Sequence, residues 1–261
     1  KGDRFNYGFS LTESGIFTIN SVQKTLTGTA YGNTKQSSIL RLPNFSGTGT
    51  LNMLAIGDSI SERGINHREL QNLFFTASTS PNTGANIRLF GTRTNNATDA
   101  PNPNSFGTIK TECRGGWWTN NFLTAARARG DSSDGPNPFW NGSDTNFINY
   151  INQLNAGVYS GSPLSGIDIF TITLGTNDIA IAGNSSAQYI ANINLLVTKM
   201  WRDYPNCKIV VCGIPPMGIN GVNKQNIITF NDALNTEFAT PRTNGTIGKL
   251  VFAPVSFWMD R

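Results

Sequence analysis

Apolar residues fall into short runs that alternate with amphipathic segments from residue 51 onward. Mostly apolar runs, typical of buried β-strands, lie at 51–56, 87–90, 168–174, 207–212 and 250–253. Apolar residues at helical spacing lie at 60–73, 121–129, 187–204 and 227–238. Strands that alternate with helices favour a parallel sheet with helices on both faces. We therefore predict an α/β fold, a three-layer α/β/α sandwich with a parallel sheet of the flavodoxin-like type, over residues 49–261.

Three stretches depart from this alternation. Within residues 1–48, short runs of strand-forming residues stand between clusters of Gly, Thr and Ser, which indicates β-strands at 15–20 and 38–42. We expect a small β-rich N-terminal appendage there. Segments 92–114 and 130–145 are rich in Pro, Asn and Gly, and we predict long loops, which in a compact domain are usually functional or disordered.

Charged residues make up only 14% of the 261 residues, against about 25% in typical soluble domains. The polar surface comes instead from Asn, Ser, Thr and Gly, which suits an extracellular, cell-surface or virion-associated protein. The net charge is +4, but no three Lys or Arg residues are consecutive, so no nucleic-acid partner is expected. No apolar segment approaches the ~18 residues of a membrane span, and no membrane partner is expected. A start at Lys1 without a secretory signal is typical of a processed or trimmed chain.

Three cysteines, Cys113, Cys207 and Cys212, form an odd set without metal-ligand spacing. Cys207 and Cys212 bracket a predicted strand on opposite faces, so they should not pair with each other. We predict buried free thiols, and neither a metal nor another cofactor.

The stretch Met53–Glu62 places Ser59 where a predicted strand turns into a predicted helix. Backbone N–H groups and the dipole at a helix N-terminus favour an anion beside the serine hydroxyl, as acyl transfer requires. Ser59 is therefore a candidate nucleophile. The alternative interpretation is that Ser59 only caps the helix, as serines often do.

Two further segments offer donors for the oxyanion that forms in acyl transfer. The N–H of Gly116 can approach a substrate closely because glycine has no Cβ. Asn177 lies just past the predicted strand 168–174 and offers its side-chain amide. Ligands of such sheets bind beyond the carboxyl ends of the strands, so Ser59 and Asn177 should emerge at one edge. The alternatives are a plain turn glycine and an Asx-turn asparagine.

In this order, the three segments resemble the blocks of the SGNH hydrolases, also called GDSL-type esterases. Gly57-Asp58-Ser59 is similar to the first block and Gly175-Thr176-Asn177-Asp178 to the third. The segment 112–119, which contains Gly115-Gly116-Trp117, resembles the glycine block of the carbohydrate-esterase branch. The resemblance covers about residues 51–258 and leaves the N-terminal part untouched.

This resemblance implies roles for individual residues. Ser59 is then the nucleophile and its own N–H one oxyanion donor, while Gly116 gives a second donor through its N–H and Asn177 a third through its side chain. Asp58 and Asp178 are expected to hold the turns rather than to react.

Trp117 and Trp118 follow the glycines. Aromatic faces pack against sugar rings, so either tryptophan can line a carbohydrate subsite, although a place in the core under the loop is as good an interpretation for each alone.

One block of the family pattern is missing. The resemblance implies an Asp-x-x-His near the C-terminus, whose histidine is the general base for Ser59, but Asp260 is not followed by a histidine. The single histidine, His67, lies eight residues after Ser59 on the predicted helix, roughly 12 Å along its axis. A base must come within about 2.6–3.2 Å of the serine oxygen or one water away, so His67 cannot serve. Either another segment or chain supplies the base, or this is a site without its base.

The leading hypothesis is a serine esterase that removes acyl groups, with acetyl expected, from a carbohydrate through an acyl-enzyme on Ser59. The alternative is a non-catalytic carbohydrate-binding or structural module on the same scaffold, for example in a phage tail or surface assembly. The missing base, the low charge and the β-rich N-terminus favour the alternative. A thioesterase or lipase of the same family is a third reading, which the polar loops disfavour.

Overall fold

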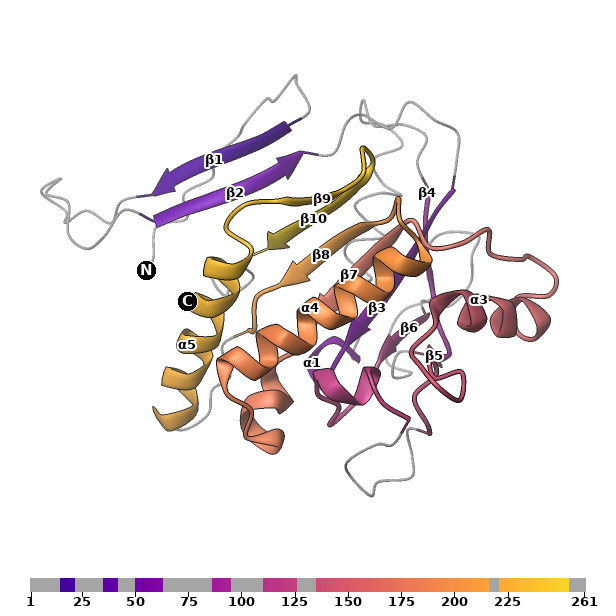
Figure 1. Cartoon of the computed structure of the whole chain (residues 1–261), viewed down its shortest axis with the longest axis horizontal. Coiled ribbons are helices and arrows are strands. Elements are labelled where there is room, and N and C mark those ends of the chain that lie inside the picture. Colours follow the sequence, from indigo (N-terminus) through magenta and orange to yellow (C-terminus); the bar gives the residue numbers. More distant parts are fainter. Residues whose placement is uncertain are drawn as a thin grey trace, which may run out of the picture.

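The computed structural model describes residues 15–21, 35–41, 50–62, 86–94, 110–125, 135–215 and 221–253. Within these ranges, eight strands form one sheet, which runs through the centre of the α/β part (Figure 1). In chain order the strands are β3 (Thr50–Gly57), β4 (Asn86–Phe90), β5 (Arg93–Thr94), β6 (Lys110–Cys113), β7 (Ile169–Thr173), β8 (Lys208–Cys212), β9 (Arg242–Asn244) and β10 (Gly248–Ala253).

Strands β3 and β7 lie side by side in the middle of this sheet. The order across it is β5-β6-β3-β7-β8-β10-β9, and β4 pairs with the first half of β3 on the side that faces β6. The pairs of β3 with β4, β6 and β7, and of β8 with β7 and β10, are parallel. Among the described strands of this main sheet, only β5 and β9 run antiparallel to their neighbours, at the two edges. Read along β3, β4, β7, β8 and β10, this is the 2-1-3-4-5 order of doubly wound folds, whose switch point lies between β3 and β7.

Three long helices cover one face of the sheet: α3 (Phe147–Ala156), α4 (Ser186–Asp203) and α5 (Gly221–Glu237) (Figure 1). In α4, the side chain of Ser185 accepts a hydrogen bond from the N–H of Gln188 and caps the start. Its buried residues recur every three or four positions from Tyr189 to Met200, which gives one apolar stripe against the sheet. None of the described helices is long and apolar enough to cross a lipid bilayer.

The centre of the sheet is buried on both faces. Leu54 and Ile56 of β3 point into the core under the three helices, whereas Met53 and Ala55 belong to a second apolar cluster on the opposite face. All four side chains are at most 3% exposed. This burial fits the predicted three-layer α/β class, which is confirmed.

Two further strands, β1 (Gly15–Ser21) and β2 (Lys35–Arg41), pair antiparallel in a sheet of their own. Gly15 lies opposite Arg41 and Ser21 opposite Lys35. The predicted strands at 15–20 and 38–42 are thus present, although the second begins three residues earlier. The division of the chain into a 1–48 appendage and a 49–261 domain stays a prediction.

The other predicted elements fare unequally. The five predicted strands of the main sheet and the helices at 187–204 and 227–238 are confirmed within a few residues, apart from a longer start of α5. The predicted helix at 60–73 is described only as α1 (Ser59–Glu62), and its remainder, with His67, lies outside the described residues. Cys113, Cys207 and Cys212 are free thiols; Cys113 and Cys207 are buried as predicted, whereas Cys212 is half-buried.

The predicted helix at 121–129 is wrong in its described part. Residues Thr119–Phe122 form a short 3-10 helix, η2, after which the chain turns. The carbonyls of Phe122 and Thr124, which a continuing helix would use internally, instead accept hydrogen bonds from Thr145 Oγ1 (2.9 Å) and Asn137 Nδ2 (3.0 Å). The predicted loop 92–114 contains β5 and β6, and α3 is missing from the prediction altogether.

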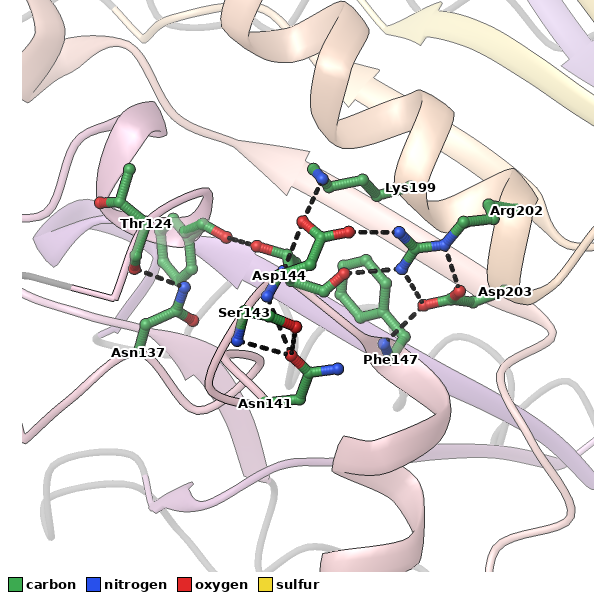
Figure 2. A network of polar contacts seen from close by, with 11 residues as sticks. Thr124, Asn137, Asn141, Ser143, Asp144, Phe147, Lys199, Arg202 and Asp203 are labelled. Carbon is green, nitrogen blue, oxygen red and sulfur yellow. Dashed lines mark hydrogen bonds and ion pairs between the residues drawn. The ribbon is translucent and has the colours of Figure 1, made fainter.

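The loop before α3 is tied to the end of α4 by a network of charged groups (Figure 2). Asp144 pairs with Lys199 and Arg202, and Arg202 also donates to the carbonyl of Thr145 (2.7 Å). Asp203, whose side chain is 4% exposed, pairs with Arg202 and accepts the N–H of Phe147 (2.7 Å) at the start of α3. The network therefore ties residues 144–147 to the end of α4.

Candidate active site

Ser59 stands at the turn between β3 and α1, as predicted. Its neighbour Asp58 supplies the cap, because Asp58 Oδ1 accepts the N–H of Ile60 (3.0 Å) and the Asp58 carbonyl accepts the N–H of Glu62 (2.9 Å). Asp58 is buried, whereas Ser59 is exposed. The interpretation of Ser59 as a mere helix cap is therefore not supported, since the capping bond belongs to Asp58.

Burial sets the protonation behaviour of Asp58. Desolvation of the carboxylate raises its pKa to about 6, although hydrogen bonding from the Ile60 N–H acts in the opposite direction. The charge of Asp178 adds a smaller upward effect on the pKa. Burial of the charged Asp58 carboxylate thus costs free energy. Its hydrogen bond from the Ile60 N–H agrees with the expected role of Asp58 in the turn.

The glycine segment forms a tight turn beside Ser59. The N–H of Trp117 donates to the carbonyl of Arg114 (3.3 Å), and Gly116 has a φ of 72°, which suits the third position of a type II turn. A Cβ placed on Gly115 would lie 3.8 Å from Ser59 Cβ and 2.9 Å from Glu62 Oε2. The turn therefore faces the serine at close range, and a larger residue than glycine at position 115 would crowd it.

Asn177 lies beyond the end of β7, after Gly175. Its Nδ2 donates to the carbonyl of Trp117 (2.9 Å), and the residue is 7% exposed. A side-chain amide has two N–H donors. The bond to Trp117 uses one of them and orients the amide group, which sets the direction of the second N–H. Asn177 thus joins the end of β7 to the glycine turn.

Asp178, the next residue, joins the segment after β7 to the start of η2. Its Oδ2 accepts both the N–H (3.1 Å) and the hydroxyl (2.9 Å) of Thr119, and its Oδ1 accepts Asn184 Nδ2 (3.0 Å). Burial raises the pKa of Asp178, against these three hydrogen bonds. Its carboxylate is occupied within the fold, in keeping with a turn-holding role.

The structure therefore brings three predicted segments together. Ser59, the Gly115–Gly116 turn and Asn177 follow β3, β6 and β7, and they meet at the carboxyl edge of the sheet beside the β3/β7 switch point. The roles of the Ser59 N–H, the Gly116 N–H and the Asn177 amide as oxyanion donors stay predictions.

The expected role of Trp117 in a sugar subsite is not supported. Its side chain is fully buried, its ring lies 4.8 Å from that of Phe122, and the guanidinium of Arg114 lies 4.8 Å from the ring centroid. A ring without exposed surface cannot stack on a sugar, so the core interpretation is correct for Trp117. Trp118 is 9% exposed, and its predicted subsite role stays a prediction.

Sequence reasoning missed the buried pair Glu112 and Arg114. Glu112 is fully buried, and its Oε2 accepts hydrogen bonds from Arg114 Nη2 (2.8 Å) and Nε (3.2 Å). An acidic and a basic residue two positions apart before a glycine turn were the available signal, but in a segment without apolar runs they resemble a solvated loop.

Among the described residues, one pocket lies away from this edge and no metal-ligand cluster is found. Within the described ranges, no three His, Cys, Asp or Glu side chains gather as metal ligands. A pocket of about 410 Å³ is lined by Arg88, Lys110 and Tyr159, among others, but by none of the predicted site residues. Arg88 of β4 lies opposite Asn52 of β3, near the start of that strand. The pocket therefore lies toward the end of β3 that is far from Ser59.

Ser59 follows β3 and Asn177 follows β7, the two strands that flank the switch point of a doubly wound sheet, and this arrangement fits the SGNH class of hydrolases. The GDSL-like lipase/acylhydrolase family matches residues 53–247, and this chain belongs to that family. It is a carboxylic ester hydrolase of the SGNH type.

A solved structure shares this fold. A carbohydrate esterase family 3 protein from Talaromyces cellulolyticus has 18% sequence identity and a TM-score of 0.51, over 79% of this chain and 80% of that chain. An acetyl esterase mutant with acetate ion has 18% identity and a TM-score of 0.49, with the same coverage. No curated protein matches the chain in sequence.

Proposed function

We propose that this esterase removes acyl groups, acetyl foremost, from a carbohydrate through an acyl-enzyme on Ser59. The observation that supports the proposal is the meeting of Ser59, the Gly115–Gly116 turn and Asn177 at one edge of the sheet. A nucleophile opposite a glycine turn and a side-chain amide is the arrangement that stabilises an oxyanion in acyl transfer.

In the proposed reaction, Ser59 Oγ attacks the ester carbonyl carbon and its proton passes to a base. The carbonyl oxygen becomes an oxyanion, which accepts hydrogen bonds from the N–H groups of Ser59 and Gly116 and from the second N–H of Asn177. Collapse of the intermediate expels the sugar oxygen, which takes up the proton. Water then attacks the acyl-enzyme with the help of the same base, so that the carboxylic acid leaves and Ser59 is restored.

The base in this proposal is a histidine from another segment or another chain. The part of the chain that the structure describes contains no histidine, and His67 was excluded above by its distance along the predicted helix. Free imidazole supplies the same group from solution, so added imidazole should raise turnover if the base is lacking.

Two features favour a small acyl group on a polar carrier over a long lipid chain. Glu62 lies beside the glycine turn and pairs with Arg93 (2.8 Å), so a carboxylate stands next to the turn with a guanidinium against it. Partly exposed charges are poor neighbours for an apolar chain, because burying them under it costs solvation energy. The composition adds to this, since it is rich in Asn, Ser, Thr and Gly, which offer little apolar surface to a long acyl chain.

The test compares substrates and one variant. The protein is incubated with acetylated oligosaccharides, nitrophenyl acetate and nitrophenyl palmitate, with and without imidazole, beside Ser59→Ala and the control Ser143→Ala. Ser143 is an exposed residue of the loop 141–145, beside the end of α4, and its hydroxyl donates to Asn141 Oδ1 (3.1 Å). We expect acetate release that Ser59→Ala abolishes and Ser143→Ala retains. If acetate release does not depend on Ser59, the reaction is excluded; glycan binding without release would then support a non-catalytic module.

A further inference from the structure

Glu112 is a fully buried carboxylate whose two oxygens are both saturated. Oε1 accepts the hydroxyl of Tyr150 (2.6 Å) and the N–H of Thr92 (2.6 Å), while Oε2 accepts Arg114 Nη2 (2.8 Å) and Nε (3.2 Å). Burial raises the pKa of Tyr150 well above its ordinary value, so its hydroxyl stays protonated and donates. Tyr150 of α3, Thr92 of the β4–β5 connection and Arg114, which follows β6, therefore all bind one side chain of β6.

Arg114 connects the buried Glu112 to the glycine turn. Its backbone N–H donates to the carbonyl of Gly57 (2.9 Å), the residue where β3 ends before Asp58 and Ser59. Its own carbonyl accepts the N–H of Trp117 and closes the turn. Its guanidinium pairs with Glu112 on one side and lies over the Trp117 ring at 4.8 Å. One residue thus fixes both the start of the turn and the ring at its end.

The same path continues to the third candidate segment. The carbonyl of Trp117 accepts Asn177 Nδ2, so any shift of the turn is passed to that side chain. The chain of contacts runs without a gap from Tyr150 through Glu112, Arg114 and Trp117 to Asn177.

We propose that Glu112 and Arg114 are positioning residues for the oxyanion site, which they serve by holding the Gly115–Gly116 turn and, through Trp117, the Asn177 amide. The inference rests on the proposed function. A buried ion pair is often no more stabilising than apolar packing of the same volume, so stability alone gives little reason for this one. The planar guanidinium, held by two bonds to one carboxylate oxygen, instead fixes the direction in which Arg114 presents its backbone.

The central experiment is a comparison of Glu112→Gln with the control Asp203→Asn. Both changes neutralise a carboxylate that pairs with an arginine and accepts a backbone N–H, but Asp203 belongs to the network at the end of α4, away from the turn. We expect Glu112→Gln to lower kcat on nitrophenyl acetate roughly 10- to 100-fold with KM within about twofold, since misplaced groups cost turnover. Asp203→Asn should lower Tm while kcat stays within about twofold.

A double-mutant cycle then tests the path. If Glu112 acts through the turn and Asn177, then Glu112→Gln combined with Asn177→Ala costs clearly less than the product of the two single losses. Independent, multiplying losses, or an unchanged kcat in Glu112→Gln, would overturn the inference. Should Glu112→Gln fail to fold, Tyr150→Phe removes one hydrogen bond to Glu112 and keeps the ring in the core; the same kcat-selective loss, in smaller size, is then required.

Absence of hydrolysis by the wild type, both without and with added imidazole, would refute the proposed function and leave this inference to a second measurement. Hydrogen exchange reports on the Trp117 backbone N–H and the Asn177 side-chain amide without any substrate. The inference requires both to lose protection in Glu112→Gln or Tyr150→Phe and to keep it in Asp203→Asn. Protection retained in all three variants would show that Glu112 does not hold the turn.

Discussion

Replacing Asn177 with alanine removes two hydrogen bonds that have different consequences. The bond from Nδ2 to the carbonyl of Trp117 (2.9 Å) is part of the resting fold. Its loss leaves a carbonyl without that donor in a buried place, which should lower the free energy of unfolding by about 1–3 kcal/mol. The second N–H, by our proposal, donates to the oxyanion. Its loss should lower kcat by roughly 10²–10³, with little change in KM, because the bond forms in the transition state.

The assay measures kcat and KM on nitrophenyl acetate and Tm by circular dichroism. Asn184→Ala is the matched control. Asn184 is a nearby asparagine whose Nδ2 also donates one hydrogen bond to a buried residue, to Asp178 Oδ1 (3.0 Å). We expect a comparable loss of Tm in both variants and a loss of kcat in Asn177→Ala alone. If Asn177→Ala retained kcat within about threefold, or if both variants lost activity in proportion to Tm, Asn177 would be a structural residue only.

Three further changes probe Gly175 after the end of β7, the buried carboxyl of Asp58, and His67. Gly175→Ala should lower the free energy of unfolding by at least about 2 kcal/mol, because φ is 123° and the new Cβ would lie 2.4 Å from Ile214 Cδ1; an unchanged Tm contradicts this. Burial raises the pKa of Asp58 from 3.8 to about 6, so the native state binds its proton more tightly and stability falls as pH rises between these values. Asp58→Asn should therefore gain stability over the wild type at pH 7.5, by up to roughly 3 kcal/mol, and lose that advantage near pH 4 in urea unfolding; an equal difference at both pH values would disprove it. His67→Ala should leave turnover and imidazole stimulation unchanged, and a large loss would make His67 the base of Ser59.

The local sequence pattern predicted the central strands because these strands are buried on both faces of the sheet. The side chains on either face are therefore mostly apolar or small. β7 reads Ile-Phe-Thr-Ile-Thr and lies between β3 and β8 in the interior of the sheet, so its composition leaves little choice of position. The site residues at its end follow from the same logic, since a parallel strand delivers its last residues to a known edge.

Local pattern failed where tertiary contacts decide. Asn121 and Phe122 begin a segment with helical spacing, but Thr145 takes the carbonyl that a helix would need. Trp117 sits beside a glycine turn, and nothing in the sequence tells which side of the turn its ring takes; the guanidinium of Arg114 holds it inside. Both outcomes depend on residues that fold against these positions from elsewhere in the chain.

Glu112 shows why the support of a site is harder to predict than its reacting groups. A nucleophile has to stand at a strand-to-helix turn, and that requirement leaves a short contiguous signature around Ser59. The partners of Glu112 include Tyr150, 38 positions away on a helix that the apolar pattern did not indicate, and the bond from Asn177 to Trp117 spans 60 positions. In the sequence, Lys110–Cys113 is a polar segment between loops; only its place beside β3 turns a carboxylate and a guanidinium into a buried pair. The groups proposed to react are therefore written locally, whereas the precision with which they are held depends on how distant segments pack.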